Sequence, residues 1–390
     1  MRHPWLRPVL SWRTDGLVPS LILIAWLLGE PVAAQGVQRA AVAMPAGTRM
    51  FTPVAVFGTD DRVPVPAKLQ PLRERIGVLF NIRQRTVCTA FCVAPTIIGT
   101  AAHCLFKTQG EKPPKLADFW FARNYDTVRD YARVAGHDRG AAGQNVMTGS
   151  FGLSTTPPIE ATSDWAFVRL SRAVCSKGVF EMAPLPAEQV IEASAEGRIF
   201  QISYHKDYKQ WQPAYSKPCA LDRTFSGVSW RTIAADFVTP EALLLHTCDT
   251  GGASSGSPLL IETPTGAKVV GINVGTYVRS RAVVHDRDTT DKSKADSIAN
   301  TGVASTAFTR RLEAFRSAHI LSDAAAMREV QERLQRGRFY NGAVDGTFGP
   351  ALARAIEAFE VAARVPTTGL ASEDVLARLR LDPATALPVR

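Results

Sequence analysis

The sequence contains no apolar run long enough to cross a membrane and no extended acidic block. Its longest apolar stretch, Leu21–Leu28, falls well short of the roughly 20 residues that a spanning helix needs. Hydrophobic residues make up 46% and charged residues 21% of the 390 positions, which is ordinary for a soluble globular protein. The composition excludes a mature membrane span and a disordered acidic tail, and the length indicates two or three folded units.

The histidines and cysteines do not form the close clusters that hold zinc, so the sequence predicts no metal site and no cofactor. The basic residues lack the interleaved aromatic residues of a nucleic-acid platform, so no nucleic-acid partner is expected. The net charge is +9, and it becomes +8 when three arginines and two acidic residues leave with the first 34 residues. Such a surface favours acidic surroundings such as anionic envelope polymers, and a generally soluble basic exterior is the alternative.

The N-terminal 34 residues have the pattern of a secretory signal. Three arginines precede the short apolar run, and Val32 and Ala34 stand three and one positions before a cut at Gln35. An uncleaved anchor is the alternative. Cleavage would leave a chain without a stable membrane span, secreted or held in the periplasm or cell envelope. Export to an oxidising compartment means that the cysteines are expected to form disulfides. About 15 pairings are possible among the six: Cys88, Cys92, Cys104, Cys175, Cys219 and Cys248.

Turn residues and periodicity divide the rest of the chain into three parts. Residues 35–70 are rich in Ala, Pro and Val and are interpreted as a linker or pro-like arm. Residues 71–321 contain short β-rich segments between Gly, Pro and Asn turns, which favours an all-β barrel or sandwich over alternating βαβ units. We expect strands at 76–82, 86–91, 95–100, 164–170, 258–261 and 269–274, an exposed loop at 279–300 and a helix at 308–319.

Residues 322–390 change to helical spacing. Apolar residues recur every three or four positions before Gly337, which ends a first helix. Pro350 is suited to open a second helix, and Ser372 to cap a third. The sequence therefore predicts a three-helix module of roughly 60 residues, which is within the range that folds alone.

The segment Thr100–Cys104 reads Thr-Ala-Ala-His-Cys, and Cys88 lies sixteen positions before Cys104. It resembles the histidine motif of the trypsin-like (chymotrypsin-fold) serine peptidases, whose cysteine pair has the same spacing. The resemblance implies a two-barrel β fold, a Cys88–Cys104 bridge, and a His103 that accepts the proton of a serine hydroxyl. A core histidine beside a structural cystine is the alternative.

The segment Cys248–Pro258 ends in Ser-Gly-Ser-Pro. It resembles the nucleophile motif of the bacterial glutamyl- and lysyl-endopeptidase branch of that family. The resemblance implies Ser255 as the nucleophile and the backbone N–H groups of Ser255 and Ala253 as the oxyanion hole. Ala253 stands where the family usually has glycine. Ser254 is a rival nucleophile, and its side chain differs from the aspartate that trypsin-style activation requires at this position.

A triad needs a buried carboxylate that orients the histidine. Asp164 opens the apolar segment 164–170 and resembles the aspartate of the family, and the order His103, Asp164, Ser255 matches that of the fold. A strand-edge aspartate without such a role is the alternative. Three further aspartates between the histidine and the serine lie in polar, irregular contexts: Asp126, Asp130 and Asp138.

The nucleophile segment also bears on the remaining cysteines. A bridge between Cys219 and Cys248 is the next expected pair because it would brace the nucleophile loop. A bridge between Cys92 and Cys175 follows by elimination.

Three residues are candidates for the specificity pocket: Asp249, Thr250 and Asn273. Asp249 lies six residues before Ser255, the offset at which trypsin carries its pocket aspartate, and would favour cleavage after Lys or Arg. Cys248 precedes it directly, unlike in trypsin, so a structural turn residue is an equal alternative. Asn273 follows Gly-Ile, where the glutamyl branch has histidine, and this argues against specificity for glutamate.

The C-terminal module carries motifs of its own: Val330-Gln331, Leu334, Phe339–Gly342, Val344–Gly346, Phe348-Gly349, Ala355-Ile356, Phe359 and Thr368–Leu370. They resemble the peptidoglycan-binding domain of many bacterial cell-wall enzymes over about residues 324–381. Most of these residues are explained as core or turn residues. Tyr340, Asn341 and Asp345 are candidates for polymer contact, with a pure folding role as the alternative.

These resemblances together predict a secreted serine endopeptidase that hydrolyses peptide bonds through an acyl-enzyme. Its expected partners are a protein or peptide substrate and peptidoglycan, to which the C-terminal module would bind. Two alternatives remain open at this point. One is a catalytically inactive envelope-binding protein with a peptidase fold, and the other is a peptidoglycan hydrolase.

Overall fold

The computed structural model describes most of the chain from residue 49 onward. The described residues are 49–52, 55–106, 114–125, 130–138, 140–209, 212–216, 219–283 and 292–385. The predicted signal at 1–34, the first part of the predicted linker or arm, and Asp126 lie outside them. Within the described ranges, no helix has both the length and the apolar character needed to cross a membrane.

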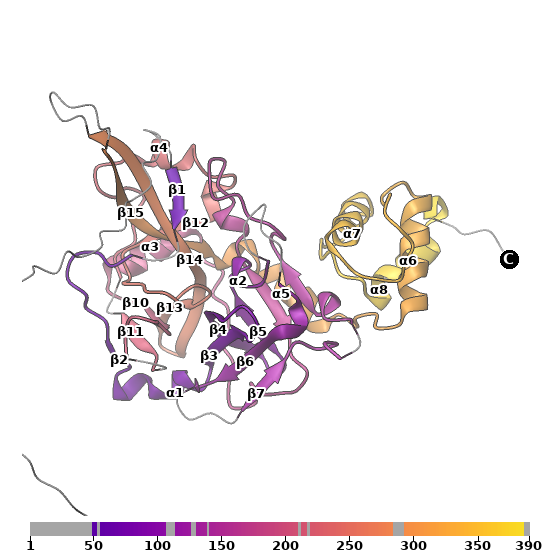
Figure 1. Cartoon of the computed structure of the whole chain (residues 1–390), viewed down its shortest axis with the longest axis horizontal. Helices are drawn as coiled ribbons and strands as arrows, with labels where there is room; N and C mark the ends of the chain where they lie inside the picture. The colour runs from indigo at the N-terminus through magenta and orange to yellow at the C-terminus, as the bar shows by residue number, and fades with distance from the viewer. Residues whose placement is uncertain are drawn as a thin grey trace, which may run out of the picture. The chain divides into compact units, whose positions relative to one another are not determined.

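Two curled β-sheets followed by helices form this part of the chain, which confirms the prediction of a mainly β fold with a helical C-terminus (Figure 1). The first sheet has seven strands in the order β7-β6-β3-β4-β5-β9-β8, and neighbouring strands are antiparallel. Its strands are β3 Ile76–Asn81, β4 Thr86–Ala94, β5 Ile97–Thr100, β6 Phe119–Arg123, β7 Tyr131–Arg133, β8 Val146–Thr148 and β9 Ala166–Arg169.

The pairing of β5 with β9 brings two distant chain segments to one end of the first sheet. Thr100, the last residue of β5, is the partner of Ala166, the first residue of β9. His103 follows Thr100 after two residues, and Asp164 precedes Ala166 by two. The two residues therefore lie at the same end of the same sheet.

The second sheet has eight strands in the order β12-β15-β14-β13-β10-β11-β2, and β1 pairs with β14 outside this path. Its strands are β1 Arg49–Thr52, β2 Val63–Pro64, β10 Ile199–Ser203, β11 Ala214–Ser216, β12 Leu243–His246, β13 Pro258–Thr263, β14 Gly266–Val283 and β15 Lys292–Ala304. Ser255 lies just before β13, so the nucleophile segment leads directly into this sheet.

The prediction of an exposed loop at 279–300 is wrong over most of its length. β14 and β15 pair from Gly271 opposite Ala304 to Val283 opposite Lys292. The backbone groups of two neighbouring strands satisfy one another whatever the side chains are, so a charged segment can still be extended. The polar composition of this segment carried no information about its backbone conformation.

Helices connect and flank the two sheets, which with α5 are called the β domain below. They are α1 Gln70–Arg73, α2 His103–Phe106, α3 Ala187–Ala195, α4 Trp230–Ala234 and α5 Thr309–Ser317, with short 3₁₀ turns at 67–69, 116–118, 143–145, 161–163, 240–242 and 305–307. The predicted helix at 308–319 corresponds to α5. Its Leu312 and Phe315 are fully buried, and the ring of Phe308 lies 5.5 Å from that of Phe167 on β9. Apolar burial of this kind holds α5 against the first sheet.

The C-terminal module has three helices where the sequence predicts them: α6 Ala324–Arg336, α7 Pro350–Ala362 and α8 Glu373–Leu381. Asp323 caps α6 by accepting a 2.8 Å hydrogen bond from Ala326 N–H, and Ser372 caps α8 through Val375 N–H. A short 3₁₀ turn follows at 383–385. The module buries its own apolar cluster, whose central members are Met327, Val330, Leu334, Leu352, Ile356, Phe359, Leu376 and Leu379.

All six cysteines are paired, in the three bridges named above. Cys88 on β4 bonds to Cys104 in α2, and so ties down the short helix that begins with His103. The other bridges are Cys92–Cys175 and Cys219–Cys248.

Candidate active site

His103 and Asp164 are in direct contact. Oδ2 of Asp164 lies 2.6 Å from Nδ1 of His103, and Oδ1 accepts a 2.9 Å hydrogen bond from the His103 backbone N–H. Asp164 is fully buried, whereas the His103 side chain keeps 20% of its surface exposed. One carboxylate thus holds both the backbone and the ring, and a ring that donates from Nδ1 carries its lone pair on Nε2.

The surroundings of His103 make it a stronger base than free imidazole. Burial by itself would lower the pKa of His103, but the charge of Asp164 and its hydrogen bond raise that pKa above the ordinary histidine value. A neutral ring that binds a proton readily is what general-base chemistry requires.

The other aspartates between His103 and Ser255 have different surroundings. Asp130 binds Nη2 of Arg123 at 2.8 Å, and Asp138 is exposed. The carboxylate that holds His103 is that of Asp164.

Ser255 approaches the histidine from the second sheet. Its backbone carbonyl oxygen lies 3.9 Å from Sγ of Cys104, and the same sulfur lies 4.0 Å from Nε2 of His103. The serine and the histidine therefore flank one atom. Within the described residues, Ser255 Oγ makes no hydrogen bond to His103. Such contacts are often long without substrate and shorten when it binds.

Residues 248–257, which contain the candidate nucleophile Ser255, are called the nucleophile loop. Thr89 on β4 fixes this loop to the first sheet. Its N–H donates a 2.9 Å hydrogen bond to the carbonyl of Ser255, and its Oγ1 donates one of 2.8 Å to the carbonyl of Ala253. Thr89 is fully buried, and its Oγ1 also accepts from Tyr204 N–H at 3.0 Å. Sequence reasoning missed this residue because a threonine within a strand carries no local signal of such a role.

Two positions in the nucleophile loop have left-handed backbone conformations. Gly256 has φ +83°, and a Cβ there would collide with Oγ1 of Thr100 and the backbone of Thr89. Only glycine fits at this position. Ala253 has φ 84°, where a residue with a Cβ is strained.

Several backbone N–H groups of this loop have no hydrogen-bond acceptor within the described residues. Among them are those of Ala253 and Ser255, the residues that the resemblance assigns to the oxyanion hole. The carbonyl groups of the same two residues are held by Thr89. Unpaired amides beside a serine hydroxyl suit the binding of a developing negative charge.

Ser254 and Asn273 lie in a buried polar group. Ser254 is fully buried, and Nδ2 of Asn273 lies 3.1 Å from its carbonyl oxygen and 3.5 Å from its Oγ. Oδ1 of Asn273 in turn lies 3.1 Å from Nε2 of His246. Burial lowers the pKa of His246 to about 4, so its ring is neutral near neutral pH. Asn273 therefore supports the nucleophile loop from within the second sheet.

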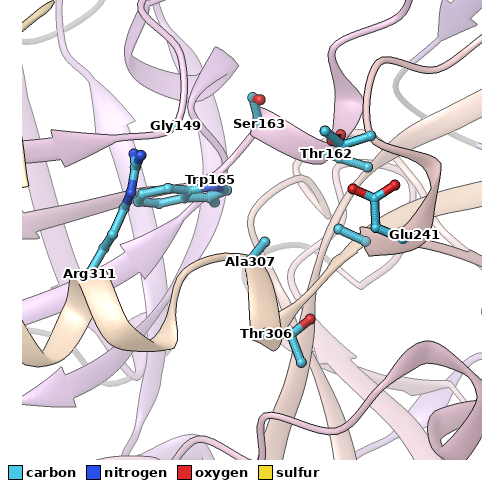
Figure 2. A pocket seen from close by; sticks show the side chains of 10 residues that line it. Gly149, Thr162, Ser163, Trp165, Glu241, Thr306, Ala307 and Arg311 are labelled. Atoms are coloured by element: carbon cyan, nitrogen blue, oxygen red, sulfur yellow. Dashed lines mark hydrogen bonds between the residues drawn. The ribbon is translucent and has the colours of Figure 1, made fainter. Parts of the chain in front are cut away.

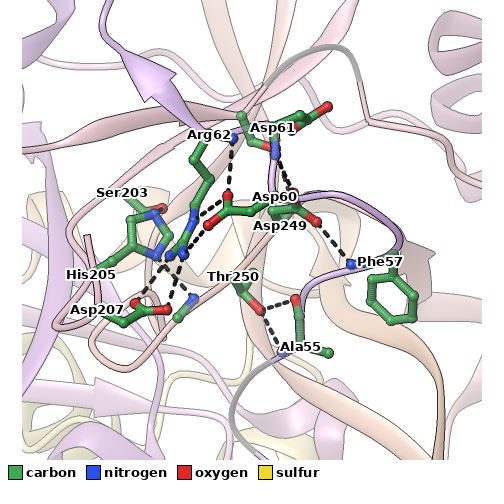
Figure 3. Close-up of polar contacts among 12 residues, drawn as sticks. Ala55, Phe57, Asp60, Asp61, Arg62, Ser203, His205, Asp207, Asp249 and Thr250 are labelled. Carbon is green, nitrogen blue, oxygen red and sulfur yellow. Dashed lines mark hydrogen bonds and ion pairs between the residues drawn. The ribbon is translucent and has the colours of Figure 1, made fainter. Parts of the chain in front are cut away.

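Asp249 and Thr250 bind the segment that precedes β2 (Figure 3). The Asp249 carboxylate accepts 3.0 Å and 2.9 Å hydrogen bonds from the backbone N–H groups of Phe57 and Asp61. Thr250 Oγ1 accepts one of 3.0 Å from Ala55 N–H, and Thr250 N–H donates one of 3.0 Å to the Ala55 carbonyl. Asp249 is only 2% exposed, and both of its oxygens are engaged in the fold.

The three residues proposed for polymer contact lie in one turn of the C-terminal module. Asp345 Oδ1 accepts hydrogen bonds from Gln331 Nε2 and Thr347 N–H at 2.9 Å and 2.8 Å, which hold the pKa of Asp345 near 2. The Tyr340 hydroxyl donates to the Ala343 carbonyl at 3.1 Å. Asn341 is exposed.

Residues 323–379 match the family described as a putative peptidoglycan binding domain. The match runs from the residue that caps α6 into α8, so the matched region coincides with the three-helix module. In this module Tyr340 and Asp345 make hydrogen bonds that stabilise the turn, and Asn341 is exposed.

No curated protein matches the chain. Many solved structures are similar to it, including the following two. "Structure of Glu endopeptidase in complex with MPD" has 15% identity and a TM-score of 0.41, and the alignment covers 67% of this chain and 98% of that one. "Crystal structure of a thermostable serine protease AL20 from extremophilic microoganism" has 17% identity and a TM-score of 0.39, with 63% and 99% covered. Both similarities are distant, so the function is inferred below from this chain's own residues.

A pocket of about 390 Å³ is lined by residues on both sides of Asp164 in the sequence, namely Thr162, Ser163 and Trp165 (Figure 2). Trp165 and Arg311 form one wall, with the guanidinium 5.6 Å from the centre of a tryptophan ring. Thr162 and Glu241 lie on the other side of it. Neither His103 nor Ser255 lines this pocket, so it is separate from the candidate catalytic groups.

One group of possible metal ligands gathers within the described residues: Cys88, His103 and Cys104. The two sulfurs are bonded to each other, so neither is a thiolate that could bind a metal. The group is a disulfide beside a histidine.

Proposed function

We propose that the β domain is a serine endopeptidase with Ser255, His103 and Asp164 as its triad. The observation that carries this proposal is the double contact of the buried Asp164 carboxylate with His103. A carboxylate placed in this way selects one tautomer of the ring and stabilises the imidazolium that forms during the reaction. Ser255 lies next to the histidine and supplies the nucleophile, and the unpaired amides beside it supply the oxyanion hole of such a site.

The first half of the reaction forms an acyl-enzyme. Nε2 of His103 takes the proton of Ser255 Oγ, and the oxygen attacks the carbonyl carbon of the peptide bond. The electron pair of the C=O bond moves to its oxygen, which the N–H groups of Ala253 and Ser255 stabilise. That pair then reforms the C=O bond, the C–N bond breaks, and His103 gives its proton to the leaving amine.

The second half releases the acid product by the same route. A water molecule replaces the amine and loses a proton to Nε2 of His103 as it attacks the ester carbon. The tetrahedral intermediate collapses, the C–O bond to Ser255 breaks, and the proton returns to the serine oxygen. No step of this sequence requires a metal ion or another cofactor.

Labelling with an active-site serine phosphonate tests this proposal. The wild-type protein should be labelled and should cleave a peptide, and Ser255→Ala should do neither while keeping its thermal unfolding profile. Ser254→Ala is the matched control and should still be labelled at Ser255. Label recovered on Ser254, or none on a folded wild-type protein, would refute the assignment and favour an inactive envelope-binding protein.

We propose further that the chain is exported and that the C-terminal domain holds the peptidase on peptidoglycan. The family match over residues 323–379 supports the binding role, and the N-terminal signal pattern supports export. Removal of residues 322–390 should reduce retention on isolated cell walls and leave turnover of a small soluble peptide nearly unchanged. A truncated protein that still sediments with walls, and leaves them at high salt, would assign retention to surface charge instead.

A further inference from the structure

In the second sheet, the edge of β14 that lies nearest to Ser255 is covered by β1, a segment from the chain's own N-terminal part. The register of β13 with β14 ends at Pro258 opposite Ile272. The next residue of β14, Asn273, is bonded to the nucleophile loop, since its carbonyl accepts from Gly256 N–H at 2.8 Å and its N–H donates to Ser257 at 2.9 Å. Beyond this point the edge of β14 that faced β13 is open to another strand.

β1 takes that open edge. It runs antiparallel to β14, with Thr52 opposite Thr276 and Arg49 opposite Arg279. The other edge of the same residues of β14 is paired with β15, so β1 lies on the side of the nucleophile loop. Figure 1 shows β1 as a separate short strand beside β14.

Residues 55–62 anchor this strand to the nucleophile loop itself (Figure 3). Besides the contacts with Asp249 and Thr250, the carbonyl of Ala55 accepts a 3.1 Å hydrogen bond from Nδ2 of Asn300. Arg62, whose side chain is 3% exposed, binds Asp60 at 2.7 Å and Asp207 at 3.0 Å. Asp249 and Thr250 lie six and five residues before Ser255, so residues 55–62 are bonded to the same loop that carries the candidate nucleophile.

We propose that β1 is a built-in competitor for peptide binding, held in place by residues 55–62. The proposal rests on the peptidase function proposed above. An extended peptide that offers a carbonyl to Ser255 and continues along β14 would pair with the backbone groups of Thr276 and the residues after it, which β1 now occupies. Strand addition of this kind is made by the main chain and tolerates many sequences. The tether raises the effective concentration of β1 far above that of a free peptide.

The competitor lowers affinity for peptides and leaves the chemical step intact. When only a fraction of the molecules has an open edge, the apparent affinity falls by that fraction. Displacement or cleavage of β1 therefore lowers KM, and kcat remains the same. The anchor at 55–62 stays in place because it satisfies the buried Asp249 carboxylate.

Two proline variants of the full chain test this, because adjacent residues of an antiparallel strand point their N–H groups in opposite directions. Proline removes the N–H group, so one of Met50→Pro and Phe51→Pro should break a bond to β14, and the other should be tolerated at an edge. In the variant that loses a bond to β14, KM for a peptide of six or more residues should be at least about tenfold lower than in the wild type, with kcat unchanged. A synthetic peptide with the sequence of residues 47–54 should inhibit that variant competitively.

A small sulfonyl fluoride separates this proposal from the one on which it rests. The reagent needs no strand pairing, so it should label Ser255 at the same rate in the wild type and in both variants. Equal labelling with KM values within twofold of one another in all three proteins would overturn the competitor and leave the peptidase standing. Absence of label in all three folded proteins would instead overturn the peptidase, and the competitor with it.

Discussion

Asp164 holds His103 at two points, one on the backbone and one on the ring. Asp164→Asn keeps the shape but loses the charge that stabilises the imidazolium. We expect kcat to fall by about 10⁴-fold with little change in KM. Steady-state kinetics on a peptide checks this, with thermal unfolding as the control for folding. Asp130→Asn, which alters a carboxylate bound to Arg123 instead, should leave kcat within twofold.

The raised pKa of His103 predicts the pH dependence of activity. The ring must be neutral to take a proton, so kcat/KM should rise with pH through an apparent pKa above 6.5. Asp164→Asn should move this acid limb to lower pH, because burial then lowers the pKa of His103 without the opposing effect of the Asp164 charge. An acid limb at the same pH in both proteins would assign it to another group. For stability the sign is opposite, since the protonated ring is favoured in the folded state and its contribution is lost as pH rises through the raised pKa.

Ala253 pairs strain with a proposed catalytic amide. Its φ of 84° is costly for a residue with a Cβ, so Ala253→Gly should stabilise the β domain by up to about 1 kcal/mol and keep activity. Calorimetry measures the change. Ala314→Gly within α5 is the matched control, and there the same substitution should destabilise by about 1 kcal/mol. Destabilisation at both positions would show that the loop does not hold Ala253 in this conformation.

The contacts of Asp249 predict a structural role. Asp249→Ala leaves two backbone N–H groups of the anchor without their acceptor, which should cost about 1–3 kcal/mol of folding free energy. Glu192→Ala, at an exposed position on α3, should cost much less. Cleavage-site profiling of Asp249→Asn should show an unchanged residue preference. A lost preference for Lys or Arg would return Asp249 to the specificity pocket.

Most of the secondary structure could be predicted from local signals in the sequence. Gly337, Pro350 and Ser372 mark helix ends whatever the rest of the chain does, and the three helices follow them. Motif resemblance chose His103 and Asp164, and the structure places the two side chains in contact. Their catalytic role stays a prediction.

Long-range backbone contacts were beyond the sequence. Thr89 acts on residues more than 160 positions away, and Asp249 binds amides about 190 positions before it. Neither residue has a neighbour in the sequence that announces its partner. The pairing of β14 with β15 was missed for a related reason, because main-chain bonds in a ribbon place few demands on side chains.

The division of the site between the two sheets bears on the period before folding is complete. The first sheet contributes His103 and Asp164, the second contributes Ser255, and Thr89 joins them. A chain in which either half is still unformed has a nucleophile without a base, or a base without a nucleophile. On the proposed function, a newly exported molecule therefore cannot cut neighbouring proteins until both sheets have formed and come together.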